Sequence, residues 1–257
     1  MSEAWRVDVL GSLISAVDAE EALGLIAQRL DEGAGGYVCF SNVHTVVMGR
    51  RDPAFRAITN ASFLSVADGK PVYWTARTQG PAGHVPGPDF MKLALDRYRS
   101  RRHFLYGSTD AVLDRLSSNL RQSLPGLQIC GKLSPPFRAL SAAERQQHYD
   151  AIRASGAELV WVGLGAPKQE QWMAEAAHTL RPAILLGVGA AFDFQAEVVG
   201  RAPKAMRDWG LEWFYRLLSQ PRRLWRRYLT TNTLFLVYLA QELRNRRRGR
   251  TETDTRH

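Results

Sequence analysis

The apolar residues of this chain form short runs that alternate with longer segments of helical periodicity. Mostly apolar runs of four or five residues occur at 37–41, 63–67, 103–106, 127–130, 159–162 and 183–186. Such runs predict buried strands, and the periodic segments between them predict amphipathic helices. Because strands alternate with helices up to about residue 195, we expect an α/β fold with a doubly wound, mostly parallel sheet.

The most regular unit covers residues 159–193. A strand at 159–162 is followed by a glycine-bracketed turn, a helix that begins at Lys168, and a second strand at 183–186 that ends in another glycine turn. A strand–helix–strand unit usually joins neighbouring parallel strands by a right-handed crossover. We therefore expect both glycine turns at the carboxyl edge of the sheet, where open α/β folds bind ligands.

Earlier segments add local detail to this picture. Residues 5–14 alternate loosely between apolar and polar, which predicts an edge strand or a hairpin. Asp18 is expected to cap the first helix, and Pro71 to lie in the first turn of another. Ser141, with Glu144 three residues later, matches the capping box of a further helix.

The basic residues are concentrated near the C-terminus. Residues 201–250 hold thirteen lysines and arginines against three acids, a net charge of +10, whereas residues 1–200 hold twenty of each sign. The last seven residues carry a net charge of −1. We therefore divide the chain into a neutral body (residues 1–200), a basic helical appendage (201–250) and a disordered tail (251–257).

A long amphipathic helix is predicted to begin at Pro221 in the appendage. One side is apolar and carries Leu224, Trp225, Tyr228, Leu229, Phe235, Leu236, Leu239 and Leu243. The opposite side is rich in arginine. Such a helix suits an anionic membrane surface, where each Lys or Arg contributes about 1 kcal/mol. Packing on the body, or on a partner subunit in a homo-oligomer, is the alternative. A neutral body without a recognisable nucleic-acid module argues against nucleic acid as a partner.

Other sequence patterns limit which cellular compartment and which cofactors we expect. Cys39 and Cys130 lie far apart in apolar segments, which indicates buried thiols in a reduced, cytosolic setting rather than a disulfide. The first eleven residues contain acids and lack an apolar core, so no secretory signal is expected. No apolar run approaches the roughly 18 residues of a membrane span. His44 and His84 are widely separated, and without Asp-x-Asp or His-x-x-x-His motifs we expect no metal site.

Four predicted strand ends carry small or polar residues that could face a ligand. They are Asn42 with His44, Asp68 with Gly69, Gly107 with Ser108, and the segment 163–169. Asp68 is the sharpest candidate, because a carboxylate just past a buried strand can act as a general base. The alternative is that Asp68 caps the helix that contains Pro71.

The glycines at 163 and 165 suggest a nucleotide site. No acidic residue ends the following strand, so a nicotinamide enzyme is disfavoured. A phosphate at the helix N-terminus remains reasonable, with Lys168 adding positive charge and Gln169 pairing with a base or sugar edge. A solvated first helical turn is the alternative. Asp193 is predicted at the same edge as a ligand contact or a helix cap.

Several ordered motifs carry a family resemblance. The segments FSNVHTVV, ADGKPVYW, GPDFMKL, VGLGAPKQEQWM, GVGAAFDFQA and RAPKAMRDWGLEWFYRLLSQPRRLWRRYL occur in that order. Over roughly residues 7–230 the chain resembles the WecG/TagA/CpsF family of bacterial glycosyltransferases. The resemblance implies a Rossmann-like body and inverting transfer from a UDP-sugar to a polyprenyl-diphosphate-linked glycan, without a catalytic metal or other cofactor. It also implies a peripheral position on the inner face of the cell membrane, in cell-surface polysaccharide synthesis.

The resemblance also assigns roles by motif position. Asp68 matches the general base, and Asn42, Gln169, Asp193, Arg216, Arg223 and Arg226 match substrate contacts. Ser41, His84, Gly107, Gly165 and Lys168, which lie at the predicted strand ends and loops, complete the set of expected substrate contacts. The three arginines match appendage residues that hold a diphosphate. Two positions depart from the pattern: Phe40 replaces a common threonine, for which Ser41 is the candidate substitute, and His84 replaces a common arginine. These departures leave open a second hypothesis, a non-catalytic family member that scaffolds a polysaccharide assembly complex.

Overall fold

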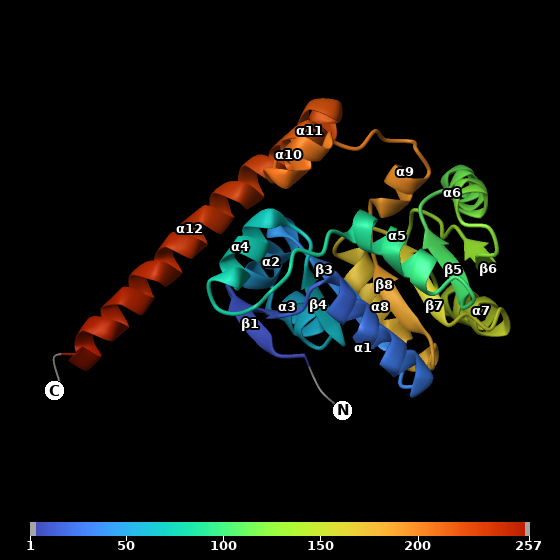
Figure 1. Ribbon diagram of the computed structural model, residues 1–257, viewed down its shortest axis with the longest axis horizontal. Helices are drawn as coiled ribbons and strands as arrows, with labels where there is room; N and C mark the ends of the chain where they lie inside the picture. Colours follow the sequence, from blue (N-terminus) through green and yellow to red (C-terminus); the bar gives the residue numbers. More distant parts are fainter. Residues whose placement is uncertain (1–3, 255–257) are drawn as a thin grey trace.

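The computed structural model describes residues 4–254, except for the side chains of Arg223 and of residues 246–254. In this part of the chain, a parallel sheet has the strand order β4-β3-β8-β7-β5-β6, with helices on both faces (Figure 1). Its strands are β3 (Gly36–Ser41), β4 (Leu64–Ala67), β5 (Arg102–Gly107), β6 (Gln128–Leu133), β7 (Leu159–Gly163) and β8 (Ile184–Gly187). The expected doubly wound, Rossmann-like fold is confirmed.

The two faces of the sheet build two separate cores, because successive side chains of a strand point to opposite faces. Val38 and Phe40 of β3 join the core on one face, and Tyr37 and Cys39 join the core on the other. The first core is covered by α1 (Ala19–Asp31), α5 (Gly87–Arg97) and α6 (Asp110–Ser123). The second is covered by α7 (Ala142–Ala154) and α8 (Lys168–Thr179).

The predicted strand–helix–strand unit is β7–α8–β8. The two strands are parallel neighbours, with Leu159 opposite Ile184 in the register. The predicted capping boxes also form: Asp18 caps α1 with Glu21, and Ser141 caps α7 with Glu144. Every neighbouring pair of strands in the sheet is parallel, so all six carboxyl ends point to one edge, and both glycine turns lie there.

A third core lies beside the main sheet. The N-terminal segment forms the predicted hairpin, an antiparallel pair of β1 (Arg6–Val9) and β2 (Ser12–Ser15). The hairpin packs with α2 (Val43–Arg51) and α4 (Lys70–Arg77), and α3 (Pro53–Asn60) lies next to α2 and α8. Both cysteines are free thiols: Cys39 is buried as expected, whereas Cys130 is only partly buried.

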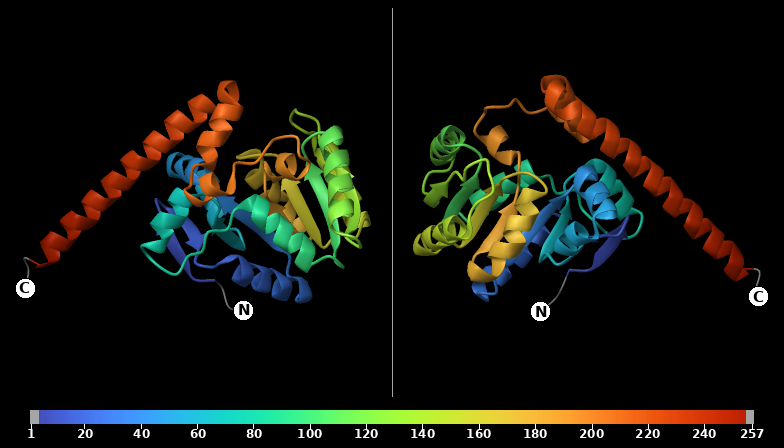
Figure 2. Two further views of the ribbon diagram at one scale, coloured as in Figure 1. Left: turned by 45° about the horizontal axis from the view of Figure 1, so that its top comes forward. Right: turned by 180° about the vertical axis from the view of Figure 1, so that it is seen from behind.

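The C-terminal region is helical and lies across the carboxyl edge. It comprises α9 (Ala191–Gln195), α10 (Lys204–Asp208), α11 (Glu212–Ser219) and α12 (Pro221–Asp254). Figures 1 and 2 show α10 and α11 at the near end of α12, which then runs past α2 and α4 and extends beyond the body. Residues 251–254, expected to be disordered, belong to α12, and the rest of the predicted tail, 255–257, lies outside the described residues.

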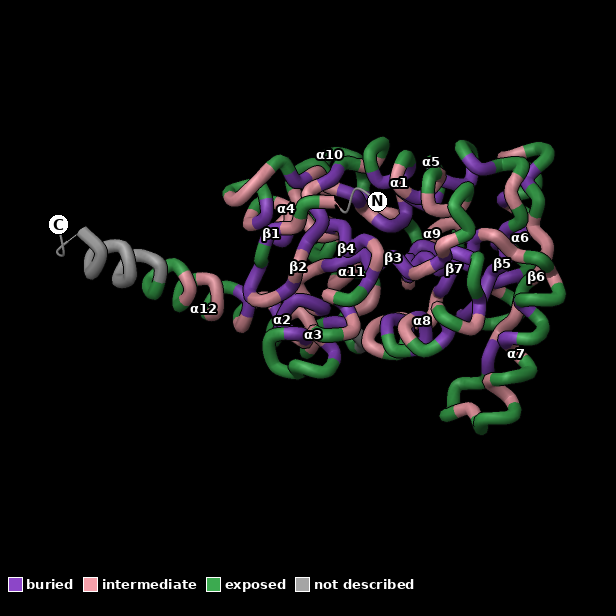
Figure 3. Tube along the Cα trace, turned by 90° about the horizontal axis from the view of Figure 1, so that it is seen from below, coloured by how far each residue is buried: buried purple, intermediate pink, exposed green. Residues whose placement is uncertain are grey.

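The apolar side of α12 is divided in two, which the sequence did not predict. Leu224 and Phe235 are buried, 2% and 3% exposed, whereas Leu229 and Leu236 are both 65% exposed. The predicted apolar sector is wider than a helix can bury against one neighbour, so half of it faces solvent along the arm in Figure 3. Within residues 4–254, the structure contains no helix with the length and apolar content needed to cross a bilayer.

Candidate active site

A cavity of about 1160 Å³ lies at the carboxyl edge of the sheet. Its wall combines the loops after β3, β4, β5, β7 and β8 with residues of α10, α11 and α12. The loops that the sequence singled out on separate strands therefore meet in one place. The predicted site residues in this wall are Asn42, Asp68, His84, Gly165, Lys168, Gln169, Asp193 and Arg216.

Asp68 follows β4 directly and is held by two hydrogen bonds. The backbone N–H of Gly87 donates to Oδ1 at 2.8 Å, and the amide of Asn42 donates to Oδ2 at 3.3 Å. Helix α4 begins after Gly69 without a side-chain cap, so the alternative role of Asp68 as the cap of that helix is wrong. The carboxylate instead receives the N–H of the first residue of α5.

The environment of Asp68 disfavours its charge. Removal from water, reinforced by the negative charge of Glu212, raises the pKa of Asp68 to about 6, although Gly87, Asn42 and Arg216 act in the opposite direction. A carboxylate with this pKa is still ionised at neutral pH, yet accepts a proton more readily than an ordinary aspartate. That combination suits a general base, whose pKa should lie near the working pH.

Asn42 orients this carboxylate through its place at the start of α2. Its Oδ1 accepts the backbone N–H groups of His44 and Thr45 at 3.1 and 3.4 Å, in a capping box completed by the Thr45 hydroxyl. Because Oδ1 is committed to the helix N-terminus, the amide nitrogen is directed at Asp68. Asn42 is therefore a positioning residue as well as part of the cavity wall.

His84, which departs from the arginine that the family resemblance leads one to expect, supplies no positive charge. Its Nε2 lies 2.9 Å from the carbonyl oxygen of Asp68, and its ring lies beside that of Tyr73. Burial, together with the charge of Lys70, lowers the pKa of His84 to about 4. The ring is therefore neutral at pH 7 and braces the backbone of Asp68.

Gln169 lines the cavity, but its amide is fully used inside the protein. The side chain is 4% exposed; its nitrogen donates to the carbonyl of Gly187 at 2.6 Å, and its oxygen accepts the N–H of Gly189 at 2.9 Å. A Cβ on Gly187 would come within 2.7 Å of that nitrogen and 2.5 Å of Met173 Cε, so a larger residue there would disturb the Gln169 amide. Gln169 therefore fastens the turn after β8 to the first turn of α8.

The N-terminus of α8 opens into the same cavity. Gly165 and Lys168 line it, and α8 has no side-chain cap. Gly165 has a φ of +76°, and a Cβ added there would meet nothing within 4 Å, so the turn borders open space. Asp193 lies in the first turn of α9 and lines the cavity, whereas the N-cap of that helix is Ala190.

Among the described side chains of the appendage, three arginines line the cavity: Arg207, Arg216 and Arg227. Of the predicted arginines whose side chains are described, Arg216 is among them and Arg226 is not. Arg226 is exposed, and its guanidinium lies 5.2 Å from the centre of the Trp225 ring; the Arg223 side chain lies outside the description. Arg227 was not predicted, although the sequence contained a signal for it. The residues of α12 that face the body follow a helical spacing: Leu224, Arg227, Tyr228, Thr231 and Phe235.

Two further predicted contacts lie outside the cavity wall. Ser41 is buried within the sheet, where its hydroxyl pairs with that of Ser65 at 2.8 Å, so it does not replace the missing threonine. Gly107 has a φ of +125°, and a Cβ there would lie 2.6 Å from the carbonyl carbon of Gly163. This glycine permits the close approach of the ends of β5 and β7, and its neighbour Ser108 lines the cavity instead.

Two further residues of the cavity wall are Glu170, which was not anticipated, and His44, which was predicted at a strand end that could face a ligand. Glu170 is 2% exposed, its Oε2 has no hydrogen-bond partner among the described residues, and burial raises its pKa. His44 likewise has a buried Nδ1 without a partner there, and burial, with the charge of Arg227, lowers its pKa to about 4. Across residues 4–254, no three His, Cys, Asp or Glu side chains gather in a metal-binding arrangement.

Comparison with known sequences identifies the class of protein to which this chain belongs. The class has to account for the doubly wound sheet, the cavity at its edge and the arginines around that cavity. The sequence profile of the glycosyl transferase WecG/TagA/CpsF family matches residues 7–249. The chain belongs to this family and is a glycosyltransferase. It is similar to the N-acetylglucosaminyldiphosphoundecaprenol N-acetyl-beta-D-mannosaminyltransferase of Bacillus spizizenii strain W23. The two are 27% identical over 217 residues, which cover 83% of this chain and 82% of the relative.

Proposed function

We propose that the protein transfers a sugar from a UDP-sugar to a polyprenyl-diphosphate-linked acceptor in cell-surface polysaccharide synthesis, with inversion and with Asp68 as general base. The observation that carries this proposal is the Asp68 carboxylate, fixed in the cavity by Gly87 and Asn42 and given a pKa of about 6 by desolvation. Family membership supports an enzyme over the scaffolding alternative, because the family is one of glycosyltransferases.

In the proposed reaction one proton is transferred to the protein and one group, UDP, leaves the donor sugar. Asp68 takes the proton of the acceptor hydroxyl, and the oxygen attacks the anomeric carbon of the donor sugar from the face opposite UDP. The bond between that carbon and the phosphate oxygen breaks, and UDP leaves with the electron pair. Attack from the opposite face inverts the anomeric configuration.

Negative charge grows on the departing diphosphate, and fixed cations nearby stabilise it. Arg207, Arg216 and Arg227 line the cavity from three different appendage helices, and Lys168 lines it from the start of α8. Guanidinium groups bind phosphate oxygens through two parallel hydrogen bonds, which suits them to this role. We therefore assign the diphosphate to the space between the N-terminus of α8 and the appendage.

The name of the similar Bacillus protein supplies the substrates for a first assay. That name describes transfer of an N-acetyl-β-D-mannosaminyl group to N-acetylglucosaminyl-diphospho-undecaprenol. We propose the corresponding UDP-sugar and lipid-linked acceptor as initial substrates. A calorimetric screen of UDP-GlcNAc, UDP-ManNAc, UDP-glucose and their uronic acids identifies the donor directly.

The variant Asp68→Asn tests the assignment of the base. We expect transfer to fall by about 10²- to 10⁴-fold, the usual contribution of a general base, while calorimetric UDP binding stays near that of the wild type. Asp150→Asn, an exposed aspartate of α7, is the matched control and should transfer normally. Near-normal turnover by Asp68→Asn would remove Asp68 from the mechanism.

We further propose that the exposed side of α12 binds the anionic inner face of the cell membrane as a peripheral contact. Trp225, Leu229 and Leu243 are 48%, 65% and 52% exposed, and the appendage carries the excess of arginine. The double variant Leu229→Glu/Leu243→Glu should lose co-sedimentation with anionic vesicles. Gln241→Glu, an exposed polar position of the same helix, should keep most of it. Equal sedimentation of both variants would contradict the membrane role.

A further inference from the structure

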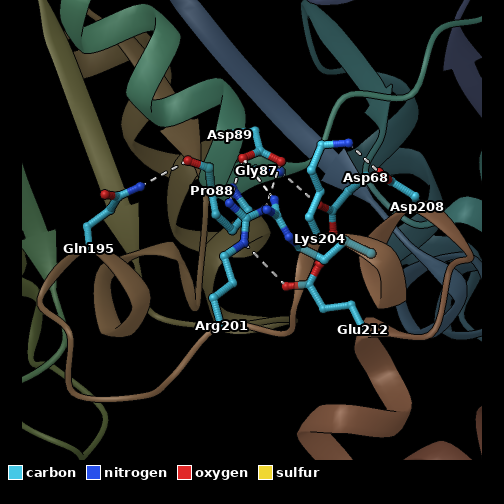
Figure 4. A network of polar contacts seen from close by, with 10 residues as sticks. Asp68, Gly87, Pro88, Asp89, Gln195, Arg201, Lys204, Asp208 and Glu212 are labelled. Atoms are coloured by element: carbon cyan, nitrogen blue, oxygen red, sulfur yellow. Dashed lines mark hydrogen bonds and ion pairs between the residues drawn. The ribbon is translucent and has the colours of Figure 1, made fainter.

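A cluster of ion pairs joins the appendage to the body just outside the cavity (Figure 4). Arg201, in the segment between α9 and α10, donates to both carboxylate oxygens of Asp89, at 2.5 and 2.7 Å. Its Nε lies 3.7 Å from Glu212 of α11. Arg207 of α10 approaches Asp89 at 3.6 Å. One carboxylate of α5 therefore contacts two separate parts of the appendage.

This cluster differs from an ordinary surface ion pair. The side chains of Arg201, Glu212 and Asp89 are only 20%, 28% and 41% exposed, and the Arg201–Asp89 contact is bidentate. Charge-assisted bidentate pairs are the stronger and more directional class, whereas fully exposed pairs contribute little. Burial alone would raise the pKa of Asp89, but the hydrogen bonds and charge of Arg201, with Arg207 and Lys92, hold it below its usual range.

The cluster is directly linked to Asp68 through the first turn of α5. Asp89 is the third residue of that helix, and the first residue, Gly87, donates its N–H to Asp68 Oδ1 at 2.8 Å. Gln195 holds the same turn by donating to the carbonyl of Pro88 at 3.0 Å. A displacement of this turn therefore displaces the donor that orients the carboxylate.

The other end of the cluster is linked to Asp68 through α11. Glu212 opens α11, and Arg216 follows one turn later; both line the cavity and both act on the charge of Asp68. Their placement depends on how the appendage is held, because the segment that carries Arg201 leads into α10 and α11. Asp89 and Arg201 themselves do not line the cavity, so any effect on chemistry is indirect.

We propose that Asp89 and Arg201 are positioning residues for the transfer reaction, whose ion pair clasps the appendage to α5 and fixes α11 over Asp68. The inference rests on the proposed role of Asp68. It assigns to the clasp the joint placement of the carboxylate that takes the proton and of Arg216, which faces the departing diphosphate.

A double-mutant cycle with Asp89→Asn, Arg201→Gln and the combined variant tests the clasp. Each single variant should lower kcat by about ten- to a hundredfold, the loss expected when reacting groups shift by about 1 Å. The combined variant should be no worse than the poorer single variant, because both remove one shared contact. Asp89→Glu, which keeps the charge, should recover part of the rate. Glu20→Gln, which breaks an exposed ion pair with Arg97 at the other end of α5, is the control.

Two readouts separate positioning from a general structural role. Amide hydrogen exchange should rise in α10 and α11 and stay unchanged in the central sheet. The acid limb of kcat/KM should also move to lower pH, because an unclasped α11 leaves Asp68 more hydrated. The charged groups that act on that carboxylate are Glu212 and Arg216 on α11. On the body side lies His84, which is neutral and is itself influenced by the charge of Lys70.

The outcomes distinguish the clasp from the base. If Asp68→Asn transfers normally, the proposed function fails, whatever the clasp variants do. If Asp68→Asn is inactive while Asp89→Asn and Arg201→Gln keep wild-type rates and exchange, the clasp is refuted. Additive losses in the double variant would also refute it, because independent contacts would then be at work.

Discussion

Replacing Asp68 by asparagine should make the protein more stable at pH 8 while removing its activity. The folded structure raises the pKa of this carboxyl from 3.8 to about 6, mainly by desolvation. At pH 8 the ionised carboxylate therefore costs the folded state about 3 kcal/mol, at roughly 1.4 kcal/mol for each tenfold change in proton affinity. Asparagine carries no charge and avoids that cost.

The substitution also loses one contact. The side-chain oxygen of the introduced asparagine still accepts from Gly87, but its nitrogen then faces the amide nitrogen of Asn42, which costs about 1 kcal/mol for one hydrogen bond. The expected net gain in the free energy of unfolding at pH 8 is about 2 kcal/mol.

The difference in stability between the variant and the wild type should depend on pH. Because the folded pKa is raised, the folded state binds more protons than the unfolded chain between about pH 4 and 6, so wild-type stability falls as pH rises through that window. At pH 4.5 the cost of the carboxylate is only about 1 kcal/mol, which the lost hydrogen bond cancels. The variant and the wild type should then be equally stable.

Urea unfolding followed by tryptophan fluorescence measures the free energy of unfolding of the variant and the wild type at pH 8 and at pH 4.5. Buried Trp161 is a natural reporter. The difference in unfolding free energy should change by about 2 kcal/mol between pH 4.5 and pH 8. A variant that gains no stability at pH 8 relative to pH 4.5 would show that Asp68 is not a destabilised carboxylate. Its assignment as a base tuned by burial would then lose its physical support.

Three shorter predictions follow from the same geometry. The kcat/KM of the wild type should rise with pH to a plateau above about 6, as Asp68 loses its proton; a flat profile from pH 5 to 8 would contradict this. Gly187→Ala should lower the unfolding free energy by about 1–3 kcal/mol, because its Cβ would meet the Gln169 amide, which two hydrogen bonds hold in place, whereas Gly24→Ala, with open space around it, should be neutral or stabilising. Glu170→Gln should stabilise the protein more at pH 8 than at pH 5, because burial raises the pKa of that carboxyl; thermal unfolding that shows the opposite order would refute it.

The fold could be predicted from the sequence because its signals are local. Short apolar runs bounded by glycine set the strands, and the capping patterns at Asp18 and Ser141 set helix starts within a residue. Strand alternation then placed the loops after β3, β4, β7 and β8 on one edge. Asp68 was found because it directly follows a buried strand, where a carboxylate can face a ligand, and the structure places it in the cavity.

What the sequence could not predict depends on contacts between distant segments. Gln169 was expected to offer its amide to a ligand, yet the turn after β8 consumes both ends of that amide. Ser41 was expected in the cavity, but its hydroxyl pairs with Ser65 of the neighbouring strand inside the sheet. In the appendage, the wheel around α12 identified an apolar side without showing which half meets the body. Arg226 was selected by its position in the family motif, whereas Arg227 is the residue that lines the cavity.

Helix α12 runs without interruption from the cavity to the far end of the arm. Its 34 residues correspond to about 50 Å at 1.5 Å per residue. A rod of that length works as a lever: tilting it by about 10° about its cavity end moves the distal end by roughly 9 Å. A partner bound to the distal half would therefore act on the angle at which Arg227 and Tyr228 enter the cavity. Binding at the arm would then change the geometry at the reacting centre.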